Sequence, residues 1–101
     1  MKSNETSEKV FEREVSRHVE SIGGVAIKMS SAFIKGLPDR LFIYRSRDGF
    51  TRVEFAEFKS TGKKPTKIQL FIHEKIRHLG IPVYVIDSVA TVNEFKNLTT
   101  L

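Results

Sequence analysis

Three stretches of the chain place apolar residues three or four positions apart, which is the spacing of one face of a helix. The first, residues 7–22, is closed by Gly23-Gly24, and the second, from residue 65 or 66 to 79, is closed by Gly80. The third follows Asp87-Ser88, a pair that can cap a short helix. Their apolar positions are, in chain order, Val15, Val19 and Ile22, then Ile68, Ile72, Ile76 and Leu79, then Val89, Val92, Phe95 and Leu98.

Short apolar runs between the predicted helices indicate strands. Residues 25–29 and 82–86 are two of them, and residues 53–59 alternate in character as a half-buried strand does. The run that opens at Asp39 and continues to Tyr44 is joined to residues 53–59 through Asp48-Gly49, a typical hairpin turn.

The order helix, strand, hairpin, helix, strand, helix predicts an α/β fold with a mixed sheet flanked by helices. The strand at residues 53–59, the helix after it and the strand at residues 82–86 form a βαβ unit, which should be parallel and right-handed. A length of 101 residues allows one core, so we expect a single domain over residues 1–101.

Composition limits the cellular location and the kinds of metal site that the protein can have. The chain has no cysteine, which excludes disulfides and thiolate zinc sites, and no apolar run in it could span a bilayer. Its polar first residues, 1–5, lack the apolar core of a signal peptide. We therefore expect a cytoplasmic protein. Two of the three histidines, His73 and His78, stand five residues apart and do not share a helix face, so no zinc site is predicted.

The net charge of +5 is unevenly distributed. Glutamates gather before residue 21, whereas Lys59, Lys63, Lys64 and Lys67 crowd into one short stretch. Such a stretch attracts a polyanion, and we take Lys63, Lys64 and Lys67 as candidate DNA-binding residues. A basic loop that is merely solvated is the alternative.

Two short motifs carry the candidate chemistry, Gly36-Leu37-Pro38-Asp39 and Glu57-Phe58-Lys59. In a strand, Glu57 and Lys59 project from the same face, and a hairpin would bring Asp39 to the same end of the sheet. Two neighbouring carboxylates repel each other unless a proton or a cation lies between them, and Mg²⁺ prefers oxygen ligands of this kind. Taken singly, Asp39 is more readily interpreted as a turn residue after Pro38, and Glu57 with Lys59 as a solvated strand face.

In combination these motifs resemble the VRR-NUC (virus-type replication-repair nuclease) family of the PD-(D/E)-X-K nuclease superfamily. The resemblance runs from about Phe11 to Ser88. It includes a glutamate in the first helix, Gly-Gly after it, Gly-X-Pro-Asp-Arg at residues 36–40, Val-X-Phe-X-Glu-X-Lys at residues 53–59, a glutamine in the next helix and Gly-X-Pro-Val-Tyr-Val-X-Asp-Ser at residues 80–88.

The resemblance implies a restriction-endonuclease-like fold and assigns roles to five residues. Asp39 and Glu57 correspond to the metal-binding carboxylates of the family and Lys59 to its catalytic lysine. The family glutamate of the first helix corresponds best to Glu12, and the glutamine of the later helix corresponds to Gln69.

The activity implied is cleavage of DNA with one or two Mg²⁺ or Mn²⁺ ions, held by Asp39, Glu57 and the Phe58 backbone carbonyl with Glu12 close by. Lys59 would orient or deprotonate the attacking water. Short members of the family resemble phage proteins that act as homodimers on four-way junctions, so we expect a phage-type junction-cutting dimer. Phe33 and Ile34 are candidates for its interface, or alternatively buried anchors of their loop.

Other readings stay open. The chain is alternatively an endonuclease that cuts flaps or linear duplex, a DNA-binding module without catalysis, or a subunit of a larger enzyme. Metal-dependent cleavage by an Asp39→Ala variant separates the last two from a true nuclease, because unchanged cleavage would reject the assigned site.

Overall fold

Helix α1, Ser7–Ser21, begins where the side chain of Thr6 accepts a hydrogen bond from the backbone N–H of Lys9. It ends before Gly23, whose positive φ of 89° suits the turn that leads into the sheet. The next residue, Gly24, has no room for a side chain, because a Cβ there would lie 2.7 Å from Cβ of Tyr44. The computed structural model describes residues 6–30 and 34–100, so the position of Phe33 lies outside the described residues.

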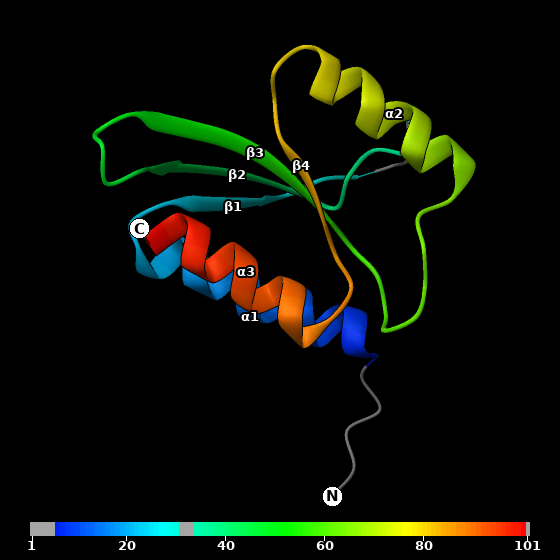
Figure 1. Cartoon of the computed structure of the whole chain (residues 1–101), viewed down its shortest axis with the longest axis horizontal. Coiled ribbons are helices and arrows are strands. Elements are labelled where there is room, and N and C mark those ends of the chain that lie inside the picture. The colour runs from blue at the N-terminus through cyan, green and yellow to red at the C-terminus, as the bar shows by residue number, and fades with distance from the viewer. Residues whose placement is uncertain (1–5, 31–33, 101) are drawn as a thin grey trace, which may run out of the picture.

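Four strands form one sheet in the order β1-β2-β3-β4 (Figure 1). They are β1 (Val25–Lys28), β2 (Arg40–Arg45), β3 (Thr51–Phe58) and β4 (Val83–Ile86). The first three run antiparallel to one another, and β4 lies parallel to β3. The hairpin between β2 and β3 turns at Gly49, as the sequence predicted. The predicted mixed α/β fold and the order of its elements are confirmed.

The main core lies between the sheet and two helices, α1 and α3 (Val89–Thr100), which share one face of the sheet (Figure 1). Val15 and Val19 of α1, Phe42 of β2 and Phe95 of α3 are essentially inaccessible to solvent. The rings of Phe42 and Phe95 lie 5.5 Å apart, a typical packing distance for aromatic pairs. The even-numbered residues of β2 and β3 face this core, which leaves Glu57 on the opposite face.

Helix α2, Lys67–His78, lies on that opposite face (Figure 1). The apolar face predicted for it is only partly buried, since Ile68 is 50% exposed and Leu79 is 81% exposed. The buried residue of α2 is instead His73. This difference has a physical cause: the helix approaches the sheet over the polar Glu57, so polar side chains take the inner positions.

Several apolar side chains are left exposed on the α2 side of the molecule. They include Val25, Ile27 and Val53 of the sheet, Phe71 of α2, and Ile34, which is 54% exposed and therefore does not anchor its loop in the core. Within the described parts of the chain, no helix is long and apolar enough to cross a membrane.

Candidate functional site

Asp39 immediately precedes β2, and its carboxylate is fixed by the end of the neighbouring strand. The β2–β3 ladder stops at the pair Arg40 and Ala56, and just beyond it Oδ2 of Asp39 accepts a hydrogen bond of 2.7 Å from the Phe58 N–H. The loop before Asp39 lies against α2 at Gly36, where a Cβ would come within 2.6 Å of the Ile68 carbonyl oxygen. Gly36 also has a φ of 85°, so both space and conformation select glycine there.

Glu57 is the centre of the cluster and is only 2% exposed. Its Oε2 accepts a hydrogen bond of 3.0 Å from Nε2 of Gln69 and lies 3.7 Å from Nζ of Lys59. The carboxyl groups of Glu57 and Asp39 are close enough to share a hydrogen bond. The structure thus brings together Asp39, Glu57, Lys59 and Gln69, four of the residues selected from sequence.

The electrostatics of the cluster favour a bound positive charge. Burial, and then the negative charge of Asp39, raise the pKa of the Glu57 carboxyl to about 8, although the charge of Lys59 acts to lower it. Without a cation, this raised pKa favours the protonated form of the Glu57 carboxyl at neutral pH. A divalent cation can replace that proton, because it stabilises the charged form of both carboxylates.

Gln69 is held in one orientation by the start of α2. Its Oε1 accepts a hydrogen bond of 2.8 Å from the Thr66 N–H, while the Thr66 side chain accepts one from the Gln69 N–H. This capping box uses the amide oxygen, so the amide NH₂ must face Glu57. The same residue therefore begins the helix and donates to the buried carboxylate.

His73 is a site residue that the sequence did not reveal. It follows Gln69 by one helical turn and is fully buried, with Nε2 3.5 Å from Oε1 of Glu57. Burial, and then the charges of Arg77 and Lys59, lower the pKa of His73, so the ring is neutral beside Glu57. The sequence feature that could have identified His73 is its position four residues after Gln69, which places both side chains on one face of the helix.

The first helix presents two glutamates to this region, and they have different partners. Oε2 of Glu12 lies 2.7 Å from Nζ of Lys28 and 2.7 Å from Nε of Arg40. Burial acts to raise the pKa of Glu12, but the hydrogen bonds from Lys28 and Arg40 lower it overall. Glu8, one turn earlier, contributes its charge to the shift at Glu57. Glu8 was not selected from sequence, although it lies on the same helix face as Glu12.

The lysine-rich loop connects the cluster to α2. Lys63 and Lys64 lie in this loop and Lys67 begins the helix, and all three are exposed. The start of the loop is tied to α1, because the Thr61 N–H donates to Oγ of Ser7 and the Glu8 N–H donates to Oγ of Ser60. The N-terminus of α1 and the lysine loop thus lie together beside Lys59.

One observation tests whether this cluster suits a cation. Oε1 of Glu57 is buried and has no hydrogen-bond partner, and both ring nitrogens of His73 are also unpartnered. Within residues 6–30 and 34–100, no three acidic, histidine or cysteine side chains gather in metal-binding geometry. Two carboxylates with an unsatisfied buried oxygen fit a hard cation that completes its shell with backbone oxygens and water.

Comparison with known proteins shows similarity to a phage protein and to a solved structure. The chain is 37% identical over 78 residues to a protein described as "Putative nuclease p44" from Acyrthosiphon pisum secondary endosymbiont phage 1. That alignment covers 77% of this chain and 80% of the phage protein. A solved structure described as a VRR-NUC domain superposes with a TM-score of 0.77 at 28% identity, covering 92% of this chain and 97% of that one. No sequence model of a protein family matches the chain.

Proposed function

The chain belongs to the VRR-NUC family of nucleases, and from this premise we propose that it is a metal-dependent DNA endonuclease whose site is built on Asp39, Glu57 and Lys59. The observation that supports the proposal most is the pair of carboxyl groups formed by half-buried Asp39 and buried Glu57, with Lys59 beside them. A buried ionised carboxylate without a partner destabilises a fold, and here Oε1 of Glu57 is buried and has no hydrogen-bond partner.

The side chains have distinct proposed roles. Asp39, Glu57 and the Phe58 backbone carbonyl would hold Mg²⁺ or Mn²⁺, and the ion would supply a Lewis acid for hydrolysis of the scissile phosphate. Lys59, whose side chain is 16% exposed, is accessible enough to touch a phosphate oxygen or the attacking water. Gln69 holds the Glu57 carboxylate in place through its amide NH₂.

We further propose that the substrate is branched DNA and that the enzyme acts as a homodimer. A chain with one site cuts one strand at a time, so symmetric cleavage of a four-way junction needs two copies related by a two-fold axis. The exposed apolar side chains on the α2 side of the molecule, among them Ile27, Val53 and Phe71, supply a surface on which a second copy could bury apolar area.

A cleavage panel tests this function. The wild-type protein with Mg²⁺ is expected to cut a four-way junction faster than a flap or a linear duplex of the same sequence, and chelation of the metal should abolish all cleavage. Sedimentation of the same sample should give the mass of a dimer. A protein that cuts no DNA with Mg²⁺ or Mn²⁺ would overturn the nuclease proposal, whereas a monomer that cuts only linear duplex would overturn the junction proposal alone.

The two glutamates of α1 offer a matched comparison. Glu12→Gln should lower the free energy of unfolding by about 1–3 kcal/mol, because Lys28 and Arg40 lose their buried anionic partner. Glu8→Gln should leave stability nearly unchanged and weaken Mg²⁺-dependent cleavage about tenfold, because its charge acts on Glu57.

Denaturant unfolding and cleavage rates measured at several Mg²⁺ concentrations separate the two effects. If Glu12 is itself a metal ligand, Glu12→Gln will instead require more Mg²⁺ for half-maximal cleavage than Glu8→Gln does.

A further inference from the structure

A groove runs along α1 on the side of the molecule that faces β1 and β2. It has a volume of about 470 Å³, and its lining carries five cationic side chains, Lys9, Arg13, Arg17, Lys28 and Arg40. Only two acidic side chains, Glu12 and Glu20, line it as well. The Glu12 carboxylate forms ion pairs with Lys28 and Arg40. The groove therefore retains an excess of positive charge along α1.

The cations of α1 form a regular row. Lys9, Arg13 and Arg17 are four residues apart, so they recur on one face of the helix and all three are exposed. The row extends for about 12 Å, the length over which one DNA strand carries about three or four phosphates. Within residues 6–30 and 34–100, Lys9 and Arg17 have no acidic side chain in ion-pair contact.

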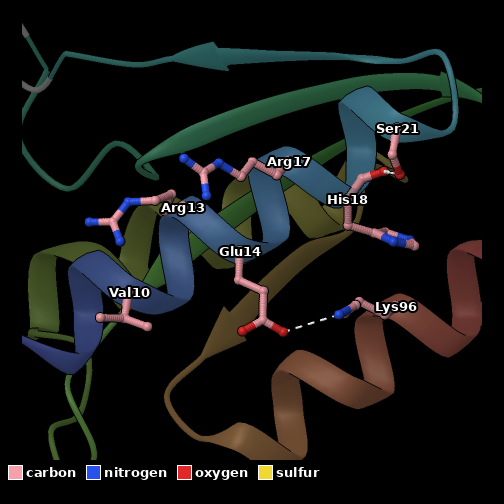
Figure 2. Close-up of a pocket in the computed structure, with 7 residues that line it drawn as sticks. All are labelled: Val10, Arg13, Glu14, Arg17, His18, Ser21 and Lys96. Carbon is pink, nitrogen blue, oxygen red and sulfur yellow. Dashed lines mark hydrogen bonds and ion pairs between the residues drawn. The ribbon is translucent and has the colours of Figure 1, made fainter.

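The arginines are directed away from the other helix of this layer. Figure 2 shows Arg13 and Arg17 side by side on α1 and pointing away from α3, whereas Glu14 turns toward α3 and pairs with Lys96 at 3.0 Å. The Glu14–Lys96 ion pair thus lies on the α3 side of α1, and the two arginine side chains extend to the other side of the helix.

A buried hydroxyl also lies in the lining of the groove. Ser16 is 7% exposed, and its Oγ has no hydrogen-bond partner. Ser16 is therefore part of the buried lining of the groove, and the exposed cationic side chains of α1 are the groups that an anionic ligand can contact.

The groove adjoins the candidate active site around the end of the sheet. Arg40 is the residue after Asp39, and strand register pairs it with Lys28. The N-terminus of α1 is hydrogen-bonded to the segment that follows Lys59. A strand leaving the site on this side meets the α1 row, while Lys63 and Lys64 lie in the loop that leads toward α2.

We propose that this groove is a second DNA-binding surface, which holds phosphates of the duplex along α1, where the DNA extends past the candidate active site. The inference rests on the proposed function for its ligand, but it concerns binding and not cleavage. Through it, α1 determines how DNA lies across the site, and the row Lys9, Arg13 and Arg17 supplies the sequence-independent part of the affinity.

Salt-dependent binding tests the inference in an Asp39→Asn background that does not cut its ligand. The probes are a fluorescent four-way junction and a linear duplex, without divalent metal. Arg13→Gln with Arg17→Gln should weaken binding about tenfold at moderate salt and make the plot of log affinity against log salt less steep by about two units. Arg13→Lys with Arg17→Lys should restore the slope, since it keeps the charge.

The matched control is Arg45→Gln with Arg47→Gln on the distant hairpin, which removes the same charge and should change the slope little. Equal slopes for wild type and the α1 variant, or an equal loss in the hairpin control, would overturn the inference. A wild-type protein that binds DNA through α1 but cuts none with metal would overturn the proposed nuclease function and leave this surface standing.

Discussion

Replacing Asp39 with asparagine is expected to lower the rate of DNA cleavage about a thousandfold, equivalent to about 4 kcal/mol in the activation barrier. The reason is that the variant removes one of the two negative charges proposed to hold the cation, yet keeps an oxygen that accepts the hydrogen bond from the Phe58 N–H. The fold should therefore survive. Single-turnover cleavage with saturating Mg²⁺ measures the effect on the chemical step.

Asp48→Asn is the matched control for this change. Asp48 is an exposed aspartate in the hairpin, where it pairs with Arg52 at 2.7 Å, and it is remote from the cluster around Glu57. Its variant should cut DNA at the wild-type rate. If Asp39→Asn retained more than about a tenth of wild-type activity, a difference of little more than 1 kcal/mol, the assignment of Asp39 as a metal ligand would be wrong.

The second large effect concerns Glu57 in the absence of metal. The pKa of its carboxyl is raised from 4.5 to about 8, so between these values the folded state binds more protons than the unfolded state. Stability from this group is fully present below pH 4.5 and is lost as pH rises through about 8. The metal-free protein should therefore lose on the order of 3 kcal/mol of unfolding free energy between pH 5 and pH 8.5.

Glu57→Gln should remove most of this pH dependence, because glutamine is neutral throughout. At pH 8.5 without metal the variant is expected to melt on the order of 10 °C above the wild type. Added Mg²⁺ should stabilise the wild-type protein, increasingly so as pH rises, and should leave the variant unchanged. Thermal melts at several pH values, with Mg²⁺ or with chelator, measure both effects.

Glu54→Gln is the control that separates burial from metal binding. Glu54 is a buried carboxylate of the same strand, but it faces the other side of the sheet and accepts hydrogen bonds from Tyr44 at 2.9 Å and Tyr84 at 3.4 Å. Burial raises its pKa too, so its variant should alter the pH profile, yet Mg²⁺ should still stabilise it. Equal Mg²⁺ stabilisation of Glu57→Gln and wild type would remove Glu57 from the metal site.

Much of the fold, and the proximity of Asp39 to Glu57, could be predicted from local sequence patterns. The spacing of Val15 and Val19 predicts a buried helix face, and the hairpin turn at Asp48-Gly49 predicts that Asp39 and Glu57 meet at one end of the sheet. These inferences succeed because helix and strand periodicity, and turn geometry, are properties of the backbone and of neighbouring residues. The family motifs then selected Lys59 and Gln69 as well.

Contacts between segments that are distant in the sequence could not be predicted in this way. The sequence could not show that α2 turns His73, and not the apolar Ile68, toward the sheet, because this depends on the polar Glu57 beneath the helix. It also gave no means of separating Glu8 from Glu12, which share a helix face. Only the packing of α1 against the sheet decides that Glu12 pairs with Lys28 and Arg40.

The sequence by itself therefore determined the elements and their order, and it selected the residues that we propose for a metal-dependent nuclease site. The tertiary structure decided the environment of each charge: which carboxylate is buried, which has a cationic partner and which oxygen is left unsatisfied. Burial and charge neighbours fix these properties, and both depend on which parts of the chain meet in space.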